Sequence, residues 1–323
     1  MPVKNLISSK VSLAPMAGIT DFVIRSLVRK YSPNCLLTTE MISSEALNQV
    51  KETNMTQRAE NHSPISYQLS GHKPKMIASC AKYLEQFADM IDINMGCPVN
   101  KVVKGTDGSA LMRNVNLAQD IVKEVKTSIN VPLSVKFRLG YTADEMNYVE
   151  FGQKMQEAGA DFITLHARTR SQMYSGHADW EKIRLLKQNV DVPVFANGDI
   201  KSIEDAEKCM EISGADGVAI GRGILGDISL ISRIERFFTT GERLTPPTLE
   251  MKIAEIKDIL LSEIEFRGEN TGIKFVRKFY PYYINGFQGA SLKRGELVLL
   301  NTTNEIFSVL DNILKENCLI YNH

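Results

Sequence analysis

Cys97 stands where an alternating apolar run, Met90–Gly96, gives way to a long polar loop. Pro98 restricts Cys97 to extended backbone geometry, which fixes the direction of the side chain. A nucleophilic cysteine needs a lowered pKa, whereas a proton donor needs a protonated thiol, which the ordinary pKa of about 8.5 already supplies at neutral pH. A packed strand-end cysteine is the alternative without chemistry. The sequence therefore permits a proton donor, and the polar, glycine-bearing loop Val99–Met112 has the composition of a lid.

Charged residues also occur in pairs within two later apolar runs. Lys136 and Arg138 are two apart in one run, and His166 and Arg168 are two apart in another, so each pair shares one face of a strand. An edge lysine or a hydrogen-bonded core histidine would be the structural explanation. Because an unpaired buried charge is costly, their joint occurrence favours a site for a polar, anionic ligand. Other polar or small residues at or near the ends of apolar runs are Pro15, Met16, Ala17, Gln68, Asn94, Asn197, Gly198, Asp199, Gly221 and Arg222.

The last two apolar runs end in small residues. One is followed by "NGD" (Asn197–Asp199) and the other by "GRG" (Gly221–Gly223). Such residues let a phosphate approach main-chain N–H groups, and Arg222 adds a cation. In barrels of parallel strands these two places often hold a phosphate, so the pattern predicts a phosphorylated cofactor.

The elements that must position these residues are short β-branched runs alternating with segments of helical periodicity. Eight runs in roughly 225 residues predict a (β/α)₈ TIM barrel over residues 1–244, with a doubly wound sheet as the alternative. The runs are Val11–Gly18, Cys35–Ile42, Pro64–Gly71, Met90–Gly96, Leu133–Gly140, Phe162–Arg170, Pro193–Ile200 and Gly217–Leu225.

A different pattern begins after the prolines Pro246 and Pro247, which cannot continue a helix. Three helical segments follow, the last over residues 296–316, and predict a small all-helical domain over residues 245–323. Within it, Gly272–Gly295 carries five basic residues, six aromatic residues and no acidic residue. This composition suits RNA, whose phosphates attract Lys and Arg and whose bases stack on rings; a packed aromatic core with cations on its solvated face is the alternative.

The composition is that of an ordinary globular protein. The chain has 323 residues, 43% of them hydrophobic, and a formal net charge of zero, so a nucleic-acid partner would meet a local basic patch. Five scattered cysteines without a C-x-x-C argue against disulfides and a metal site. The sequence shows no signal-peptide pattern and no apolar stretch of spanning length, so we expect a cytoplasmic protein, not bound to membrane, and a monomer.

The motifs together resemble the tRNA-dihydrouridine synthases, and most of all the bacterial B-type subgroup. They are "APMAGITD" (Ala14–Asp21), "INMGCPVNKVVKGTDGSAL" (Ile93–Leu111), "VKFRLG" (Val135–Gly140), "LHARTRSQMYSGHADW" (Leu165–Trp180), "NGDI" (Asn197–Ile200) and "IGRG" (Ile220–Gly223). The resemblance covers nearly the whole chain in order. One departure is Arg277-Lys278-Phe279, where the family has Arg-Lys-His.

The resemblance implies a flavin-dependent oxidoreductase that reduces the C5–C6 bond of specific uridines in tRNA, with bound FMN and with NADPH, or NADH, as the reductant. Cys97 would protonate C5 while reduced flavin delivers hydride to C6. The FMN residues that the resemblance implies are Pro15, Met16, Ala17, Gln68, Lys136, His166, Asn197, Gly198, Asp199, Gly221 and Arg222. The residues expected to meet the tRNA or its uracil are Asn94, Arg138, Arg168, Lys274, Arg277 and Lys278.

Two other functions are compatible with parts of the sequence. An FMN barrel that acts on a free pyrimidine, similar to dihydroorotate dehydrogenase, would share the cofactor site but would have no use for a basic, aromatic helical tail. A tRNA-binding or RNA-folding protein would use the tail but would have no use for Cys97 and Lys136.

Overall fold

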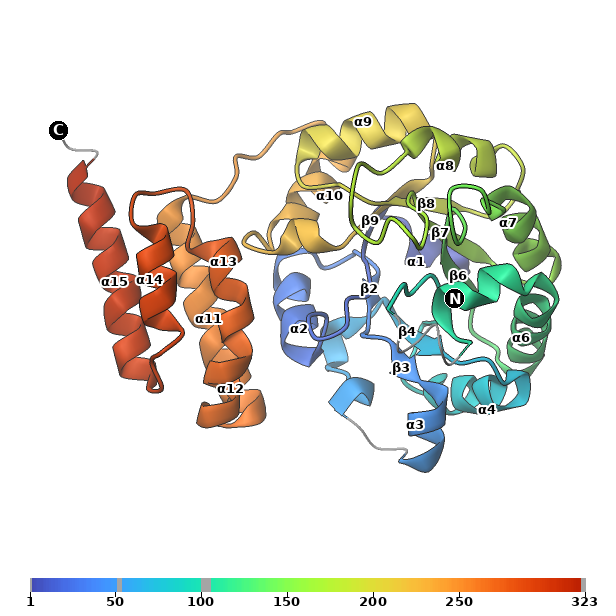
Figure 1. Cartoon of the computed structure of the whole chain (residues 1–323), viewed down its shortest axis with the longest axis horizontal. Helices are drawn as coiled ribbons and strands as arrows, with labels where there is room; N and C mark the ends of the chain where they lie inside the picture. The colour runs from blue at the N-terminus through green and yellow to red at the C-terminus, as the bar shows by residue number, and fades with distance from the viewer. Residues whose placement is uncertain (1, 51–53, 100–105, 321–323) are drawn as a thin grey trace. The chain divides into compact units, whose positions relative to one another are not determined.

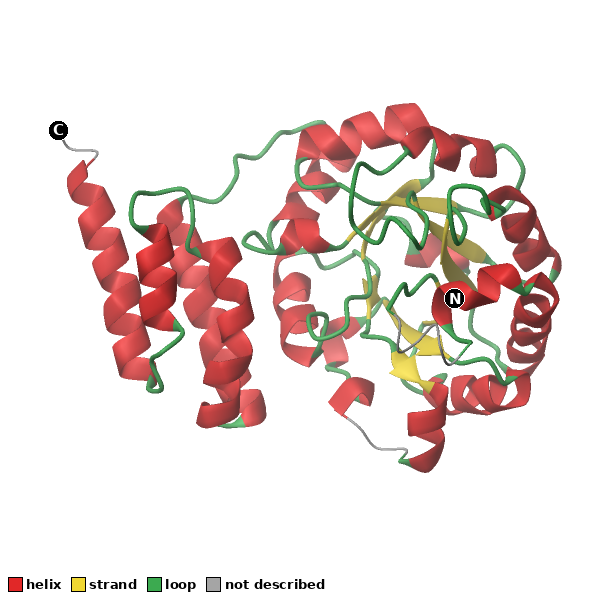
Figure 2. Cartoon of the chain, in the orientation of Figure 1, coloured by secondary structure: helices red, strands yellow, loops and turns green. Residues whose placement is uncertain are grey.

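The computed structural model describes residues 2–50, 54–99 and 106–320, with side chains as far as residue 317. The chain divides into two compact units, of which one is Met1–Gly221 with Ile231–Arg243 and the other Arg222–Leu230 with Leu244–His323. The first contains all the described strands, and the second is helical (Figures 1 and 2). A TIM barrel followed by a helical domain is therefore confirmed as the fold class.

The barrel is a ring of parallel strands. Its order is β1-β9-β8-β7-β6-β5-β4-β2, and β3 pairs with β4 beside that path. A parallel bridge between Ser12 and Leu36 joins the two ends of the ring. The strands are β1 (Val11–Leu13), β2 (Leu37–Thr38), β3 (Ile42–Ser43), β4 (Ile65–Ser70), β5 (Met90–Met95), β6 (Leu133–Arg138), β7 (Phe162–His166), β8 (Val194–Asn197) and β9 (Gly217–Ile220).

Helices surround the ring, and the second unit consists of helices and the loops that join them (Figure 2). Those of the barrel unit are α1 (Val3–Leu6), α2 (Phe22–Tyr31), α3 (Ser44–Gln49), α4 (Pro74–Leu84), α6 (Val115–Ser128), α7 (Tyr148–Glu157), α8 (Trp180–Lys187), α9 (Ile203–Ser213) and α10 (Leu230–Thr240). Those of the second unit are α11 (Leu249–Arg267), α12 (Glu269–Val276), α13 (Tyr280–Tyr283), α14 (Ala290–Leu297) and α15 (Thr303–Ile320). The 3₁₀ helices are η1 (Asn54–Thr56), η2 (Glu60–His62), η3 (Gly108–Arg113), η4 (Arg222–Ile224) and η5 (Arg277–Phe279).

The helix boundaries follow from local capping. The Asp21 carboxylate accepts the N–H of Ile24 at the start of α2, over 3.1 Å. The Ser202 hydroxyl does the same for α9, and Gly214 ends that helix in the left-handed conformation with φ of 60°. Capping also corrects the helix predicted over residues 296–316, because Thr302 accepts the N–H of Glu305 and starts the new helix α15.

The amino-terminal end of the barrel is closed by apolar side chains. Leu6 and Ile7, at the end of α1, pack in one buried cluster with Met90, Phe162 and Phe195. The rings of Phe162 and Phe195 meet edge to face, 4.9 Å apart. Small and polar interior residues are therefore left to the opposite, carboxyl end.

The second unit has its own core around α11. Glu255 is buried there; it accepts the main-chain N–H of Ile228 over 3.1 Å and the hydroxyl of Tyr283. Lys257 pairs with Asp311 of α15 over 2.6 Å. The segment Arg222–Leu230 therefore packs with these helices.

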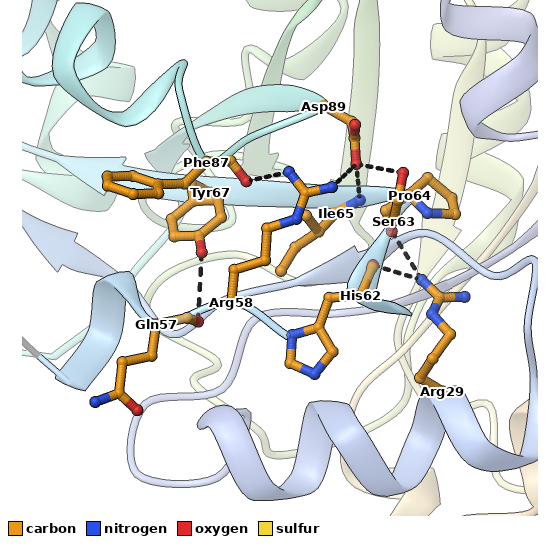
Figure 3. Close-up of polar contacts among 10 residues, drawn as sticks. All are labelled: Arg29, Gln57, Arg58, His62, Ser63, Pro64, Ile65, Tyr67, Phe87 and Asp89. Atoms are coloured by element: carbon orange, nitrogen blue, oxygen red, sulfur yellow. Dashed lines mark hydrogen bonds and ion pairs between the residues drawn. The ribbon is translucent and has the colours of Figure 1, made fainter. Parts of the chain in front are cut away.

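A polar cluster ties α2 to the amino-terminal ends of β4 and β5 (Figure 3). Arg29 donates to the carbonyl oxygens of His62 and Pro64 over 2.8 and 3.0 Å. Arg58 donates to another carbonyl, and the Asp89 carboxylate accepts the N–H of Ile65 over 2.9 Å. Because residues at this end of a TIM barrel serve stability rather than catalysis, we assign the cluster to the fold.

His62 gives this cluster a pH dependence. It is fully buried, its Nε2 lies 2.9 Å from the Ser26 hydroxyl, and burial together with the charges of Arg25, Arg29 and Arg58 lowers its pKa from 6.5 to about 3. The folded protein thus holds His62 neutral at pH values where the unfolded chain protonates it.

We expect the free energy of unfolding to decrease as the pH falls from 6.5 towards 3, by on the order of 1 kcal/mol per pH unit from His62 alone. The unfolded state then binds a proton that the folded state does not. Urea denaturation at several pH values measures the slope. His62→Gln is the control, since it cannot titrate, and the two proteins should differ in slope within this window; parallel slopes would show that His62 is not responsible.

Candidate active site at the carboxyl end of the barrel

Cys97 lies in a turn held on both sides by hydrogen bonds. The Asn94 Oδ1 atom accepts the N–H groups of Gly96 and Cys97 over 3.1 and 2.9 Å. The carbonyl oxygen of Cys97 accepts the N–H and the hydroxyl of Ser109 over 3.1 and 2.9 Å. Cys97 is half-buried, and burial raises the pKa of its thiol. The thiol therefore carries its proton at neutral pH, as a proton donor must.

Lys136 lies inside the barrel and reaches across to β8. Its Nζ atom donates to Asn197 Oδ1 over 3.0 Å, and Asn197 Nδ2 donates to the carbonyl of Ala219 over 2.7 Å. Burial, with the neighbouring charge of Arg138, lowers the pKa of Lys136 to about 8. The lysine is thus mostly a cation at pH 7, and it loses its charge as the pH rises through about 8.

A pocket inside the barrel has Lys136 in its wall and reaches down to Phe162 of the amino-terminal cluster; most of its side chains are small. Its lining residues are Ser12, Ala14, Pro15, Leu36, Thr38, Ser66, Asp92, Ser134, Lys136, Phe162, Thr164 and Ala219. Among these, Asp92 and Lys136 are the ionisable side chains. The pocket therefore places one cation and one carboxylate among small side chains inside the barrel.

Gln68, Asp92 and Asn94 form a buried chain of amides that ends on a carboxylate. Gln68 Nε2 donates to Asp92 Oδ2 over 2.6 Å, and Asn94 Nδ2 donates to Gln68 Oε1 over 2.8 Å. Ser134 donates to the other oxygen of Asp92 over 2.6 Å. Sequence reasoning missed Asp92 and Ser134, although Asp92 shares a strand face with Asn94 and so could have been included by the same two-residue spacing as Lys136 and Arg138.

The two arginines expected to meet the substrate are buried and hold loops. Arg138 donates to the carbonyls of Gly96, Thr169 and Met173 over 2.9, 3.0 and 2.8 Å. Arg168 donates to the carbonyls of Ser175 and Gly176 over 3.1 and 2.7 Å, and it pairs with Asp199 over 2.6 Å. Their contact with a substrate stays a prediction; in this structure they shape the site by fixing the loop after β7.

The residues expected on the phosphate side gather at the ends of β8 and β9. At Gly198, with φ of 124°, a Cβ atom would lie 2.8 Å from Ala178 and 3.2 Å from the His166 ring, so only glycine fits. A Cβ at Gly221 would lie 3.6 Å from the Met16 sulfur, which places the loop after β1 beside β9. Arg222 is exposed and belongs to the second unit.

Several residues of the expected cofactor set lie close to one another. Pro15 and Lys136 line one pocket, Asn197 bonds to Lys136, His166 approaches Gly198, and Met16 approaches Gly221. Ala17 is exposed in the loop after β1. The barrel-side members of the expected cofactor set thus meet at one end of the barrel, with a half-buried cation, Lys136, among them.

Part of the expected lid, residues 100–105, lies outside the described residues. The described part after this gap begins at Thr106, and there the Asp107 carboxylate pairs with His72 Nδ1 over 2.7 Å. This pair and the bonds from Ser109 fix the loop to β4 and to Cys97.

Three cations of the second unit were expected to meet tRNA. Lys274 is exposed, and the Lys278 ammonium lies 3.0 Å from the ring centroid of Phe275. Arg277 is half-buried and donates to the carbonyl of Leu300 over 3.1 Å. Phe279, Tyr280 and Tyr283 are buried, so part of the aromatic character of this segment serves the core.

Comparison with known proteins gives one family. The sequence profile of the family described as "Dihydrouridine synthase (Dus)" matches residues 12–318. A "Probable tRNA-dihydrouridine synthase 1" of Synechocystis sp. is 42% identical, with 95% of this chain and 86% of the relative covered. A "Probable tRNA-dihydrouridine synthase" of Rickettsia bellii is 36% identical, with 96% and 95% covered. A "tRNA-dihydrouridine synthase B" of Shewanella oneidensis is 34% identical, with 96% and 97% covered.

Two further properties concern only the described part of the chain. No helix there is both long and apolar enough to cross a membrane. Nor do three or more His, Cys, Asp or Glu residues within it come together as a metal site.

Proposed function

Because the chain belongs to the dihydrouridine synthase family, we propose that it reduces the C5–C6 bond of uridines in tRNA, using bound FMN and NADPH, in the cytoplasm. The observation that carries this proposal is the meeting of a protonated Cys97 with a cation, Lys136, both half-buried, at the carboxyl end of one barrel. That end is where TIM-barrel enzymes place their chemistry.

Cys97 is the proton donor in this reaction. When bound, FMN supplies the hydride that adds to C6 of uracil. The Cys97 thiol gives its proton to C5, the uracil ring gains two hydrogens in all, and the thiolate that remains recovers a proton from solvent. The raised pKa of Cys97 suits this task, because it keeps the proton on sulfur until the substrate takes it.

The other residues bind and orient. We propose that Lys136 and Gln68 hold the flavin ring, with Pro15, Met16 and Ala17 lining it and His166 beside it. Asn197, Gly198, Asp199, Gly221 and Arg222 would hold its phosphate side. Asn94, Arg138 and Arg168 would meet the uracil or the adjoining backbone.

The tRNA would be held by basic residues of the helical unit, residues 245–323, while the barrel, residues 1–244, performs the chemistry. Lys274, Arg277 and Lys278 are the proposed phosphate contacts. A uridine must leave its stack to reach a site inside a barrel mouth, so binding and chemistry involve different surfaces.

Nucleoside mass spectrometry tests the proposal. The purified protein is incubated with NADPH and tRNA that lacks dihydrouridine, and we expect a uridine to gain two hydrogens. A protein that takes up FMN and oxidises NADPH, yet changes a free pyrimidine and no tRNA, would contradict the proposed substrate. A protein that binds tRNA and no flavin would contradict the proposed chemistry.

Lys136 should make FMN binding depend on pH. We expect the affinity to fall as the pH rises through about 8, because the ammonium that faces the flavin is then lost. Quenching of flavin fluorescence between pH 6.5 and 9 gives the dissociation constants. Lys136→Arg keeps a charge throughout this range and should give a flat profile, whatever its absolute affinity; a profile that still falls would assign the dependence to another group.

A further inference from the structure

A chain of hydrogen bonds runs from Asp92 through Gln68 and Asn94 to the main chain at Cys97, and the groups at its two ends can each act in only one way, as donor or as acceptor. At one end, the main-chain N–H groups of Gly96 and Cys97 can only donate. At the other end, the Asp92 carboxylate can only accept. The amides of Gln68 and Asn94 lie between them, so they join the two ends in one orientation alone, with each carbonyl towards Cys97 and each NH₂ group towards Asp92.

The three side chains of this chain are buried. Gln68 is 0%, Asp92 5% and Asn94 9% exposed. If Asp92 could not accept, the Gln68 NH₂ group would be left buried without its acceptor or would have to turn over, and a turned amide would present the wrong group to Asn94.

We propose that Asp92 is a positioning residue for Cys97. As the terminal acceptor it sets the orientation of both amides, and through Asn94 it holds the main-chain turn that aims the thiol. The carbonyl of Cys97 is fixed independently by Ser109, so the Asp92 chain controls the amino side of the turn. The consequence for proton transfer rests on the proposed function, whereas the control of the turn does not.

Asp92 also acts as a negative charge near Lys136 and works to raise the pKa of that lysine. A test must therefore separate the acceptor from the charge. Asp92→Asn removes the charge and keeps an oxygen that accepts from Gln68. Asp92→Leu has similar size and removes both the charge and the acceptor.

The test is the exchange of the main-chain amide protons of Gly96 and Cys97, followed by NMR on the purified protein without substrate. We expect exchange at both amides to become about tenfold faster or more in Asp92→Leu, because the turn opens more often, and to stay within about twofold of wild type in Asp92→Asn. Ser134→Ala is the matched control, since it removes a bond to Asp92 on the side away from Cys97; its exchange should also stay within about twofold.

Equal exchange in Asp92→Leu and Asp92→Asn would overturn the proposal, because the acceptor would then have no effect of its own. Faster exchange throughout the barrel, rather than at residues 96 and 97, would likewise overturn it in favour of a general loss of stability. If Asp92→Leu does not fold, Gln68→Met breaks the next link while Asp92 stays charged, and the same local increase is expected; wild-type exchange in that variant would overturn the proposal.

Activity provides a separate readout. In single turnovers at saturating tRNA, dihydrouridine formation should be about tenfold slower or more in Asp92→Leu than in Asp92→Asn, which shares its loss of charge. Wild-type protein that forms no dihydrouridine would refute the proposed function, and the amide exchange would still test the role of Asp92.

Discussion

Replacing Cys97 with alanine is expected to slow dihydrouridine formation by about 10²–10⁴-fold, the usual loss when a positioned proton donor is removed. The uracil that accepts the hydride would then lose the thiol assigned to protonate C5. FMN content, oxidation of NADPH and tRNA affinity should stay as in wild type. Single-turnover formation of dihydrouridine, measured by mass spectrometry, gives the rate.

Two variants make the Cys97 result specific. Cys97→Ser is nearly the same size but is a far weaker acid, so it should be almost as slow as alanine. Cys209→Ala removes a fully buried thiol of α9 and should keep wild-type turnover. A fast Cys97→Ala protein would leave the proton donor unassigned, and loss of tRNA binding together with activity would indicate that Cys97 shapes the binding surface.

Arg29→Met is expected to lower the free energy of unfolding of the barrel by about 3–5 kcal/mol. The Arg29 guanidinium is 5% exposed and donates to four carbonyl oxygens, which methionine would leave without donors in a buried place. These oxygens belong to Ser32, Pro33, His62 and Pro64. Urea denaturation followed by tryptophan fluorescence measures the loss in the barrel, because Trp180 is the sole tryptophan and starts α8.

Arg113→Met is the matched control for Arg29. The Arg113 side chain is 51% exposed and pairs with an exposed carboxylate, Glu145, so its removal should change stability by less than about 1 kcal/mol. Similar losses in the two variants would mean that the buried carbonyls find other donors, and that Arg29 has no special place in the fold.

The fold was predictable because alternation of apolar residues identifies strands whatever their partners are. Each of the eight predicted runs contains a strand that pairs in the ring. The exception in detail is Cys35–Ile42, predicted as one strand. Its regular pairing stops at Thr39, whose hydroxyl accepts the N–H of Gln68, and the chain pairs again only at Ile42 as β3. A side chain replacing a main-chain acceptor leaves no mark on the apolar pattern.

The position of the site in the barrel could be predicted from the sequence better than the contacts of its side chains. The two-residue spacing placed Lys136 inside the barrel, and the structure shows it bonded to Asn197. The same spacing gave no sign that Arg138 and Arg168 donate to main-chain carbonyls. All of these carbonyls but that of Gly96 come from the loop after β7, whose path depends on the finished barrel. The sequence shows on which face of a strand, and near which end, a residue lies. The hydrogen-bond partners of a long side chain depend instead on the loops that cover it.

The helical unit is made from two stretches of chain, and this limits how it can be exchanged between proteins. Gly226 packs so closely that a Cβ atom there would collide with the carbonyl of Tyr282, and Ile228 bonds to Glu255. If the helices after residue 244 were grafted from one protein onto the barrel of another, they would pack against a segment 222–230 from the other protein. The glycine that fits closely against these helices would then not be the one from their own parent. A functional chimera needs both stretches from one parent. During synthesis, residues 222–230 can form these contacts only after α11 and α13 have been made.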